Sequence, residues 1–362
     1  MRRTVLKALL AAPAAVALPR FSLAQTKPEK AKLTIAVGGK NLFYYLPLTI
    51  AEQLGYFKAE GLEVEIPDFA GGSKALQALV GGSADVVSGA YEHTINMQAK
   101  NQPIQSIVLQ GRAPQIVLAV STKTMPDFKS IADLKGKKIG VTAPGSSTAM
   151  MASYVLAKAG IKTSDVSFIG VGASSGAITA VKSGQVDAIV NLDPVITMLE
   201  RDKLIKIISD TRTLKDTQAV YGGPMPAACL YAHNKFVQEN PVTCQALANA
   251  MVHALRWLQK AGPSEIVKTV PDSYLLGDRS LYLAAWEHVR EAISPDGLMP
   301  DAGPATALRV LQTFEDSLKG KTTDADDFPG PVNQGVNGLL AIACEFAGDV
   351  CAAGDRLLDR AP

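Results

Sequence analysis

The sequence predicts an α/β protein made of two related lobes followed by a helical C-terminal part. A polar loop, a short amphipathic helix, a glycine and an apolar strand occur in this order twice, 102 residues apart. The fixed points of the two copies are Ser73 and Ser175, Ala75 and Ala177, Ala78 and Ala180, Gly82 and Gly184, and Asp85 and Asp187. A strand and a helix precede each copy, so each lobe has βαβαβ order. Ligands of open α/β sheets bind at the carboxyl ends of the strands, which predicts a ligand cleft between the lobes.

Length and composition agree with this prediction. A chain of 362 residues is long enough for more than one domain. Hydrophobic residues make up 47% and charged residues 19%, which is typical of globular proteins. Two long repeats are too few for a solenoid, so two lobes remain the simplest arrangement.

Residues 1–24 read as a secretory signal rather than as part of the fold. Arg2 and Arg3 precede an apolar stretch over residues 5–18, and Ser22-Leu23-Ala24 offers a cleavage site with small residues. The arginine pair is compatible with twin-arginine or with Sec export. No later stretch has the roughly 18 consecutive apolar residues of a membrane helix, which predicts a periplasmic protein after export.

The charge balance gives no reason to expect a nucleic acid or membrane partner. Removal of residues 1–24 takes away four basic residues and no acidic one, which changes the net charge from +2 to −2. We expect a monomer whose partners are a small solute and a membrane permease.

Four cysteines lie in the C-terminal third of the chain. An even number in an exported protein favours disulfides, and Cys344 with Cys351 is the preferred pair. Cys229 and Cys244 are either a second bridge or two buried thiols. No C-x-x-C motif is present, which argues against a zinc ribbon or a thioredoxin-type site.

The elements of the first lobe follow from apolar runs and glycine stops. Strands are expected at 33–38, 62–66, 85–88 and 104–109, and helices at 46–54, 73–80 and 92–100. An apolar run at 116–120 is expected to cross to the second lobe.

The second lobe repeats this order. Strands are expected at 138–142, 166–169, 187–191 and 204–208, and helices at 148–159 and 174–182. Asp193-Pro194 predicts another helix start, with Asp193 as the N-cap and Pro194 as the first helical residue. A second crossing is expected at 227–232, and two crossings suit closure about a hinge.

Domain boundaries follow from these crossings. Lobe I comprises residues 32–117 and 233–335, where helices begin at 241, 280 and 304, and lobe II comprises residues 118–232. Residues 322–335 read as a loop. The tail at 336–362 has no assigned role.

The strongest candidate for an anion site is the start of the helix after 138–142. Ser146, Ser147 and Thr148 follow a Pro-Gly turn, and helix N-termini offer free N–H groups and a positive dipole end. Gly72 and Ser73 occupy the equivalent place in the first lobe, where glycine lets the backbone approach a ligand. The alternative for each hydroxyl is an ordinary helix cap.

Further candidates follow other strands. Asn41 and Tyr44 follow the first strand, Tyr91 and Glu92 follow the third, and Asp193 follows its counterpart in lobe II. Carboxylates at strand ends could bind an amine or could cap helices, and both alternatives remain open. The four histidines have no metal-ligand spacing, and no Gly-x-Ser-x-Gly elbow is present, so we expect no metal, cofactor or catalytic residue.

Several motifs resemble one known family. They are Tyr45-Leu46-Pro47-Leu48, residues 52–62 (EQLGYFKAEGL), Phe69-Ala70-Gly71-Gly72-Ser73, residues 133–141 (DLKGKKIGV) and Asn240-Pro241. Over roughly residues 32–270 the chain resembles the solute-binding proteins of ABC transporters of the sulfonate, nitrate and taurine type, which are related to the binders of thiamine-pyrimidine precursors. The resemblance implies a type II periplasmic binding protein fold. It also implies an anionic group held near Ser146–Thr148.

One departure from that family concerns the ligand. Asp193 stands where an aromatic residue before proline is common, and with Glu92 it favours a zwitterion or an amine-bearing ring over a simple alkanesulfonate. The resemblance implies capture of a small anionic or zwitterionic organic solute for an ABC importer. The alternatives are a pyrimidine-precursor binder, a synthase-like enzyme, although the cysteine-rich motif of such enzymes is missing, and a ligand-sensing subunit for a receptor.

Overall fold

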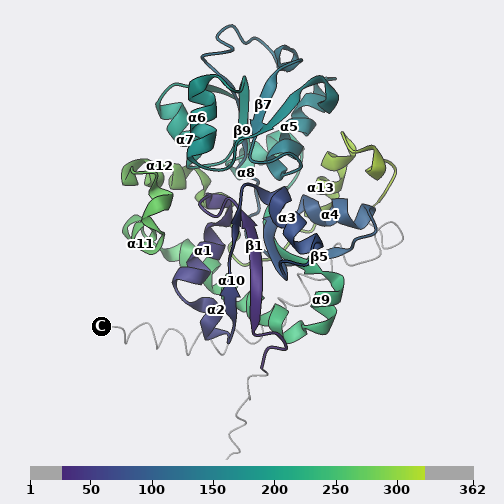
Figure 1. Cartoon of the computed structure of the whole chain (residues 1–362), viewed down its shortest axis with the longest axis vertical. Coiled ribbons are helices and arrows are strands. Elements are labelled where there is room, and N and C mark those ends of the chain that lie inside the picture. The colour runs from purple at the N-terminus through teal and green to yellow at the C-terminus, as the bar shows by residue number, and fades with distance from the viewer. Residues whose placement is uncertain (1–26, 323–362) are drawn as a thin grey trace, which may run out of the picture.

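The computed structural model describes residues 27–322, which form two α/β lobes stacked along the long axis of the molecule (Figure 1). The expected signal segment, the tail at 336–362, Cys344, Cys351 and nearly all of the loop at 322–335 lie outside the described residues. The two-lobed α/β architecture predicted from the repeat is confirmed.

Lobe I contains the first sheet, with strand order β2-β1-β4-β11-β5, and β3 also pairs with β1. Its strands are β1 (Lys32–Gly38), β2 (Glu63–Glu65), β3 (Asp68–Phe69), β4 (Val86–Ala90), β5 (Ile104–Leu109) and β11 (Ala228–His233). Its helices are η1 (Phe43–Tyr45), α1 (Leu46–Gln53), α2 (Tyr56–Ala59), α3 (Gly72–Val80) and α4 (Glu92–Ala99).

Lobe II contains the second sheet, with strand order β10-β6-β9-β7-β8. Its strands are β6 (Val117–Ser121), β7 (Lys138–Val141), β8 (Ser167–Gly170), β9 (Ala188–Asn191) and β10 (Ile205–Asp210). Its helices are η2 (Ile131–Leu134), α5 (Ser147–Lys158), η3 (Thr163–Asp165), α6 (Ser175–Ser183), α7 (Val195–Arg201) and α8 (Leu214–Tyr221).

Each sheet has one antiparallel strand that arrives from the other lobe. β6 runs antiparallel to β9 and β10, and β11 runs antiparallel to β4 and β5. The prediction that the run up to residue 232 belongs to lobe II was wrong for this strand, because β11 pairs only with strands of the first sheet. Sequence pattern could not decide this, since a buried apolar strand looks the same in either sheet. The other domain boundaries stay a prediction.

Two segments therefore connect the lobes, residues 110–116 and residues 211–227. They lie side by side, because Thr211 N–H donates to Ile116 O at 3.0 Å and Ala227 N–H donates to Gly111 O at 2.9 Å. Gln115, within the first segment, has a positive φ of 60°. We call these two adjacent segments the hinge region, and the second of them contains α8.

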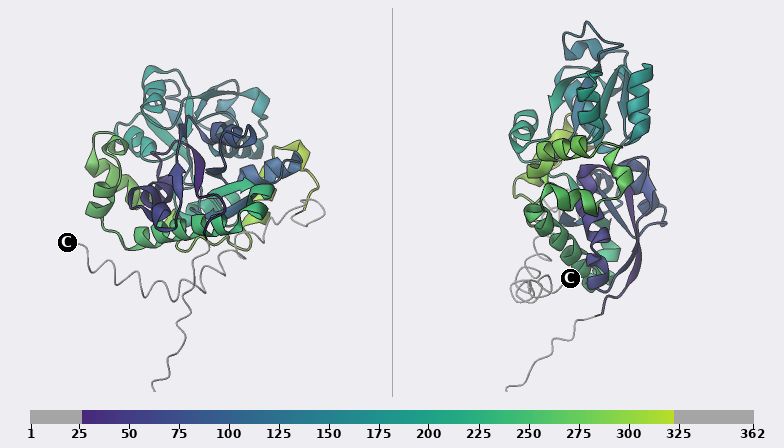
Figure 2. Two further views of the ribbon diagram at one scale, coloured as in Figure 1. Left: turned by 60° about the horizontal axis from the view of Figure 1, so that its bottom comes forward. Right: turned by 90° about the vertical axis from the view of Figure 1, so that its left-hand side faces the viewer.

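The C-terminal helices pack beside both lobes (Figure 2). They are α9 (Asn234–Glu239), α10 (Pro241–Lys260), α11 (Pro263–Thr269), α12 (Arg279–Val289) and α13 (Gly303–Gln312), with short 3-10 turns at Asp272–Leu275, Arg290–Ala292 and Asp316–Leu318. α10 lies on α1 and α2, α12 contacts α7, and α13 contacts both α4 and α5. This part thus supports the junction between the lobes as well as lobe I.

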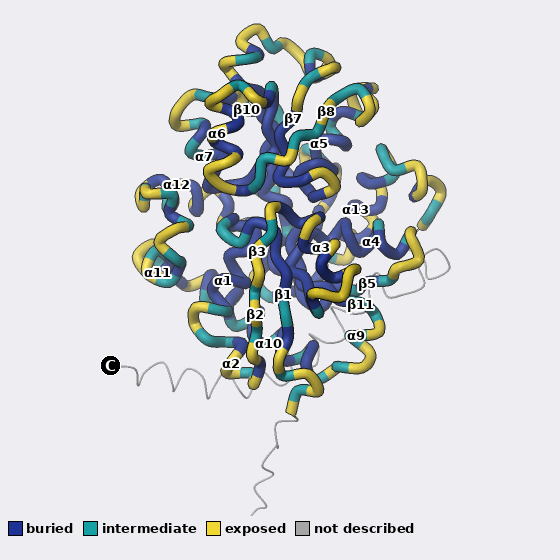
Figure 3. The backbone as a smooth tube through the Cα atoms, in the orientation of Figure 1, coloured by how far each residue is buried: buried dark blue, intermediate teal, exposed yellow. Residues whose placement is uncertain are grey.

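The interior of both lobes is apolar, and the central strands are buried along their length (Figure 3). Cys229 in β11 and Cys244 in α10 are buried free thiols, so of the two alternatives for this pair the structure has the thiols. None of the described helices is long and apolar enough to cross a membrane.

Some local expectations were wrong. α7 begins at Val195 with Pro194 as its N-cap residue, so Asp193 lies one residue before the N-cap position predicted for it, although its side chain still accepts from Thr197 N–H of the helix. The helix expected to continue from 304 to 318 ends at Gln312. α8, α9 and α11 lacked a strong apolar period and were not expected, because tertiary packing stabilises such short helices more than their own sequence does.

Candidate ligand-binding site between the lobes

The loops that follow β1, β4, β7 and β9 meet between the lobes. Asn41 Nδ2 of lobe I donates to Ala173 O of lobe II at 2.9 Å. The backbone N–H of Phe43 donates to Asp193 O at 3.3 Å. These contacts place the carboxyl ends of the parallel strands of both sheets against each other, where α/β sheets bind ligands.

The N-termini of α3 and α5 touch through two serines. Ser73 N–H donates to Ser146 Oγ at 3.0 Å, Ser146 Oγ donates to Ser73 Oγ at 3.2 Å, and Ser73 Oγ donates to Pro144 O at 2.8 Å. Ser146 is the N-cap residue of α5 but makes no side-chain cap bond to its own helix. Its hydroxyl therefore joins the lobes instead of capping α5.

Glycine is required where these helix starts approach each other. A Cβ atom on Gly71 would lie 2.8 Å from Ala143 Cβ, and one on Gly38 would lie 2.1 Å from the Gly71 carbonyl carbon. Gly72, one of the predicted site residues, is the first residue of α3 and lies near the Tyr45 hydroxyl and His93. Gly71 thus sets how closely the two lobes can meet, whereas Gly38 lets the end of β1 approach the start of α3 within lobe I.

The three predicted hydroxyls of α5 have three different surroundings. Thr148 Oγ1 accepts from Thr142 N–H at 3.1 Å and bonds to Thr142 Oγ1 at 2.9 Å, which fixes the loop between β7 and α5 inside lobe II. Ser146 contacts Ser73 as described. Ser147, the first residue of α5, faces the Tyr44 hydroxyl of lobe I.

Tyr44 crosses the junction from lobe I. It lies in η1 with 2% of its surface exposed, and its hydroxyl has no hydrogen bond of standard geometry within the described residues, although it lies beside Ser147. Burial and the nearby Glu92 raise the pKa of Tyr44 well above its usual value, so it stays a neutral phenol. A buried hydroxyl without a partner is costly in a protein interior, which makes it a candidate ligand contact.

Glu92 is the second buried polar group without a partner here. It is the first residue of α4 and 4% exposed, and its Oε2 atom has no hydrogen-bond partner within residues 27–322. Burial raises the pKa of the Glu92 carboxyl to about 7, against a smaller opposite effect of its own backbone N–H. Its predicted neighbour Tyr91 precedes α4 and is also buried.

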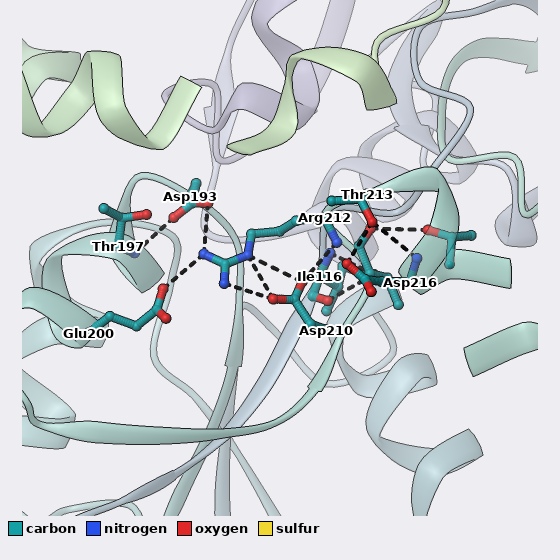
Figure 4. Close-up of polar contacts among 10 residues, drawn as sticks. Ile116, Asp193, Thr197, Glu200, Asp210, Arg212, Thr213 and Asp216 are labelled. Carbon is teal, nitrogen blue, oxygen red and sulfur yellow. Dashed lines mark hydrogen bonds and ion pairs between the residues drawn. The ribbon is translucent and has the colours of Figure 1, made fainter. Parts of the chain in front are cut away.

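Asp193 has a different environment, although it follows β9, the strand of lobe II that corresponds to β4. Its Oδ1 accepts from Thr197 N–H at 2.8 Å and its Oδ2 lies 3.5 Å from Arg212 Nη1 (Figure 4). The same guanidinium bonds more closely to Glu200 and Asp210, at 2.8 and 2.7 Å. Burial raises the pKa of Asp193, and Arg212 offsets this only in part because its shortest contacts are to the other two carboxylates. Asp193 is therefore engaged within lobe II.

Sequence reasoning missed several residues of this region. His93 bonds to the Tyr231 hydroxyl at 3.0 Å and to Gly145 O of lobe II at 3.3 Å, with Nε2 as the donor to the carbonyl. Burial lowers the pKa of His93 to about 4, so it is neutral at pH 7. No local pattern marks Tyr45, Tyr221, Tyr231 or Arg212, which come from distant segments.

A surface hollow elsewhere in the molecule is not part of this site. It has a volume of about 600 Å³ and is lined by Lys30, Pro103, His233, Asn234, Lys235, Phe236, Glu239 and Asn240. Lys30 precedes β1 and Pro103 precedes β5, so the hollow lies at the amino ends of the parallel strands, away from the lobe junction. The described residues contain no cluster of three or more metal-ligating side chains.

With this geometry in place, comparison with known proteins gives the family. Residues 42–265 match the NMT1/THI5-like family. The chain belongs to that family. The match spans both lobes and the hinge region, which are the parts that form the candidate site.

Curated relatives include binding proteins and a synthase. A Bacillus subtilis binding protein, YtlA, is 23% identical over 82% of this chain and 86% of its own length. A Brucella abortus (strain 2308) binding protein is 29% identical over 69% of this chain and 72% of its own. A 4-amino-5-hydroxymethyl-2-methylpyrimidine phosphate synthase of Schizosaccharomyces pombe is 25% identical over 61% of this chain and 63% of its own.

Solved structures confirm the periplasmic binding protein fold predicted from the resemblance. A protein of Bordetella bronchiseptica RB50 is 62% identical, with a TM-score of 0.80, over 81% of this chain and 93% of its own. The alkanesulfonate-binding protein SsuA of Xanthomonas axonopodis pv. citri, bound to MOPS, has a TM-score of 0.61 at 20% identity, over 81% of this chain and 96% of its own. At that identity the second likeness concerns the fold alone.

Proposed function

We propose that this chain is the solute-binding component of an ABC importer and that it binds its solute between the two lobes. It acts in the periplasm as a monomer and delivers a small anionic or zwitterionic organic solute to a membrane permease. The family match, the fold and the named binding proteins among its relatives support this proposal.

One observation supports the position of the site. Two polar atoms of lobe I are buried here: Glu92 Oε2 has no partner in the described residues, and Tyr44 Oη has no hydrogen bond of standard geometry there although it lies beside Ser147 of lobe II. Buried polar groups in proteins are nearly always hydrogen-bonded, so these atoms are suited to bind a solute that contacts both lobes.

The hinge region supports binding by closure. The lobes are joined by two adjacent segments, and the contacts of Asn41, Ser73 and His93 with lobe II are all made across the junction. A solute that bridges the lobes stabilises this closed arrangement by its affinity for it.

The experiment has two parts. Mass spectrometry of the denatured protein detects a solute that co-purifies, and a thermal-shift screen tests alkanesulfonates, taurine, nitrate, bicarbonate, aromatic acids and thiamine-pyrimidine precursors. A native-state ligand raises the melting temperature by mass action. Saturable one-to-one binding of one class supports the proposal, whereas no co-purified molecule and no shift with any compound contradicts it.

The synthase among the relatives suggests the main alternative, a binder of pyrimidine precursors or an enzyme acting on them. A shift with the pyrimidine panel alone would favour the binder. Product formation from a pyridoxal compound, followed by absorbance and mass spectrometry, would favour the enzyme.

A further inference from the structure

We propose that Glu92 and the tyrosines around it form a subsite for a positively charged nitrogen of the solute. This inference rests on the proposed function and narrows its substrate class to solutes that carry an amino or amidino group. The observation behind it is that the buried Glu92 carboxylate has no cation beside it among the described residues and is surrounded by tyrosines instead.

Glu92 has no counter-ion among the described residues, unlike the other buried carboxylate at the lobe junction. Two carboxylates at the lobe junction are almost fully buried, Glu92 at 4% and Asp193 at 1% exposure. Asp193 has Arg212 at 3.5 Å, whereas Glu92 makes no ion pair in the described part of the chain. Its neighbour His93 cannot supply the charge, because its ring is neutral and bonded to Tyr231 and Gly145 O. An ionised Glu92 therefore needs a cation from outside the described residues.

Five tyrosines and one cysteine lie near Glu92. The groups that interact electrostatically with Glu92 are Tyr44, Tyr45, Tyr91, Tyr221, Tyr231 and Cys229. They come from η1, the β4–α4 turn and β11 of lobe I and from α8, which lies in the segment that connects the lobes. Tyrosine faces attract cations and phenol oxygens accept hydrogen bonds from N–H groups. Burial raises the pKa of the Cys229 thiol to about 12, so no second negative charge is present at neutral pH.

The surroundings of Tyr44 indicate how a solute would be oriented in the site. Tyr44 lies near both Glu92 and Ser147, the first residue of α5. The positive end of a helix dipole and a serine hydroxyl suit an acceptor or anionic group. A solute that places its nitrogen at Glu92 and its acceptor group at Ser147 is short and has opposite polarity at its two ends.

An inorganic or purely anionic solute fits less well. Nitrate and simple alkanesulfonates have no group that donates to Glu92 Oε2, and they are repelled when that carboxyl is ionised. They would bind only with Glu92 protonated, so their affinity would fall as the pH rises above neutrality. A solute with a cationic nitrogen shows the opposite pH dependence, because it binds the ionised carboxylate.

The test compares probes that differ only at the nitrogen. The pairs are taurine and isethionate, β-alanine and 3-hydroxypropanoate, and 4-amino-5-hydroxymethyl-2-methylpyrimidine and its 4-hydroxy analogue. Calorimetry measures each affinity for the wild type, for Glu92→Gln and for Glu63→Gln, a control carboxylate that is exposed on β2. Circular dichroism verifies folding, and Tyr44→Phe serves as a second site variant.

The expected result is at least ten-fold tighter binding of the nitrogen member of one pair to the wild type. Glu92→Gln abolishes this preference and Glu63→Gln keeps it. If the oxygen member binds equally well, or if Glu92→Gln retains the preference, the cation subsite is wrong while solute binding stands.

Co-purified material decides the remaining outcomes. If no probe binds but the denatured protein releases a small molecule, a basic nitrogen in that molecule supports the subsite and its absence overturns it. If no probe binds and nothing is released, the proposed function itself fails, and the inference fails with it.

Discussion

Glu92 and Asp193 follow corresponding strands of the two lobes, one residue apart in the register of the repeat, but have different partners. Each follows the strand that ends the repeated unit, β4 in lobe I and β9 in lobe II, and burial raises the pKa of both carboxyls. Asp193 is held by Arg212 and Thr197, whereas Glu92 has tyrosines, the Cys229 thiol and its own backbone N–H near it and makes no ion pair within the described residues. One repeated pattern thus provides a structural carboxylate in one lobe and a candidate ligand contact in the other.

The largest expected effect comes from removing the partner of Asp193. Arg212→Met leaves Asp193 buried without a cation and also removes the ion pairs to Glu200 and Asp210. Breaking one side of a buried ion pair costs about 3–5 kcal/mol, so urea unfolding should show a loss of that size. Arg201→Met is the matched control, because its ion pairs are half exposed and should cost about 1 kcal/mol or less. Equal losses in the two variants would contradict the structural role of Asp193.

The opposite sign is expected for Glu92. Between pH 4.5 and about 7 the folded protein keeps a proton on Glu92 that the unfolded chain has released, so this group lowers stability as the pH rises. The Glu92→Gln variant has no carboxyl that titrates at this position. Its gain in free energy of unfolding over the wild type should grow from near zero at pH 4.5 to about 3 kcal/mol at pH 8. Urea unfolding of the wild type and of Glu92→Gln at the two pH values, without added solute, measures this gain, and a gain that does not grow with pH would contradict it.

His93 should show a pH dependence in the other direction. The pKa of His93 is lowered to about 4. Its contribution to the free energy of unfolding is therefore complete above pH 6.5 and is lost as the pH falls towards 4. His93→Gln should cost about 2 kcal/mol at pH 7, since it loses the bonds to Tyr231 and to Gly145 O. The loss should shrink at pH 4. His253→Gln, in α10, is the control, and a pH-independent loss in His93→Gln would contradict this interpretation.

The smallest expected effect distinguishes the Ser146 hydroxyl from the Thr148 hydroxyl. Ser146→Ala removes the acceptor of Ser73 N–H across the junction, whereas Thr148→Ala removes contacts inside lobe II. A single neutral hydrogen bond contributes about 1 kcal/mol, so amide exchange at Ser73 should become roughly five-fold faster in Ser146→Ala. Exchange at Ser73 should be nearly unchanged in Thr148→Ala. Similar acceleration in both variants would mean that Ser73 N–H is not protected by the other lobe.

Local sequence signals predicted most elements and the region of the site. The repeat placed Ser73, Glu92, Ser146 and Asp193 after strands whose carboxyl ends meet, and in the structure these residues lie at the lobe junction. Which partner each one has could not be predicted. Ser146 reads as a helix cap in sequence, yet its hydroxyl contacts Ser73, and Asp193 reads as a helix cap, yet it also pairs with Arg212.

The sequence by itself determined the two-lobed α/β architecture, since apolar periodicity, glycine stops and a 102-residue repeat are local properties of the chain. Only the tertiary structure decided that β11 joins the first sheet, that Tyr221 and Tyr231 approach Glu92, and that Arg212 neutralises Asp193 but not Glu92. These outcomes depend on distances between segments far apart in the chain. Burial and charge pairing act through those distances, and no local pattern records them.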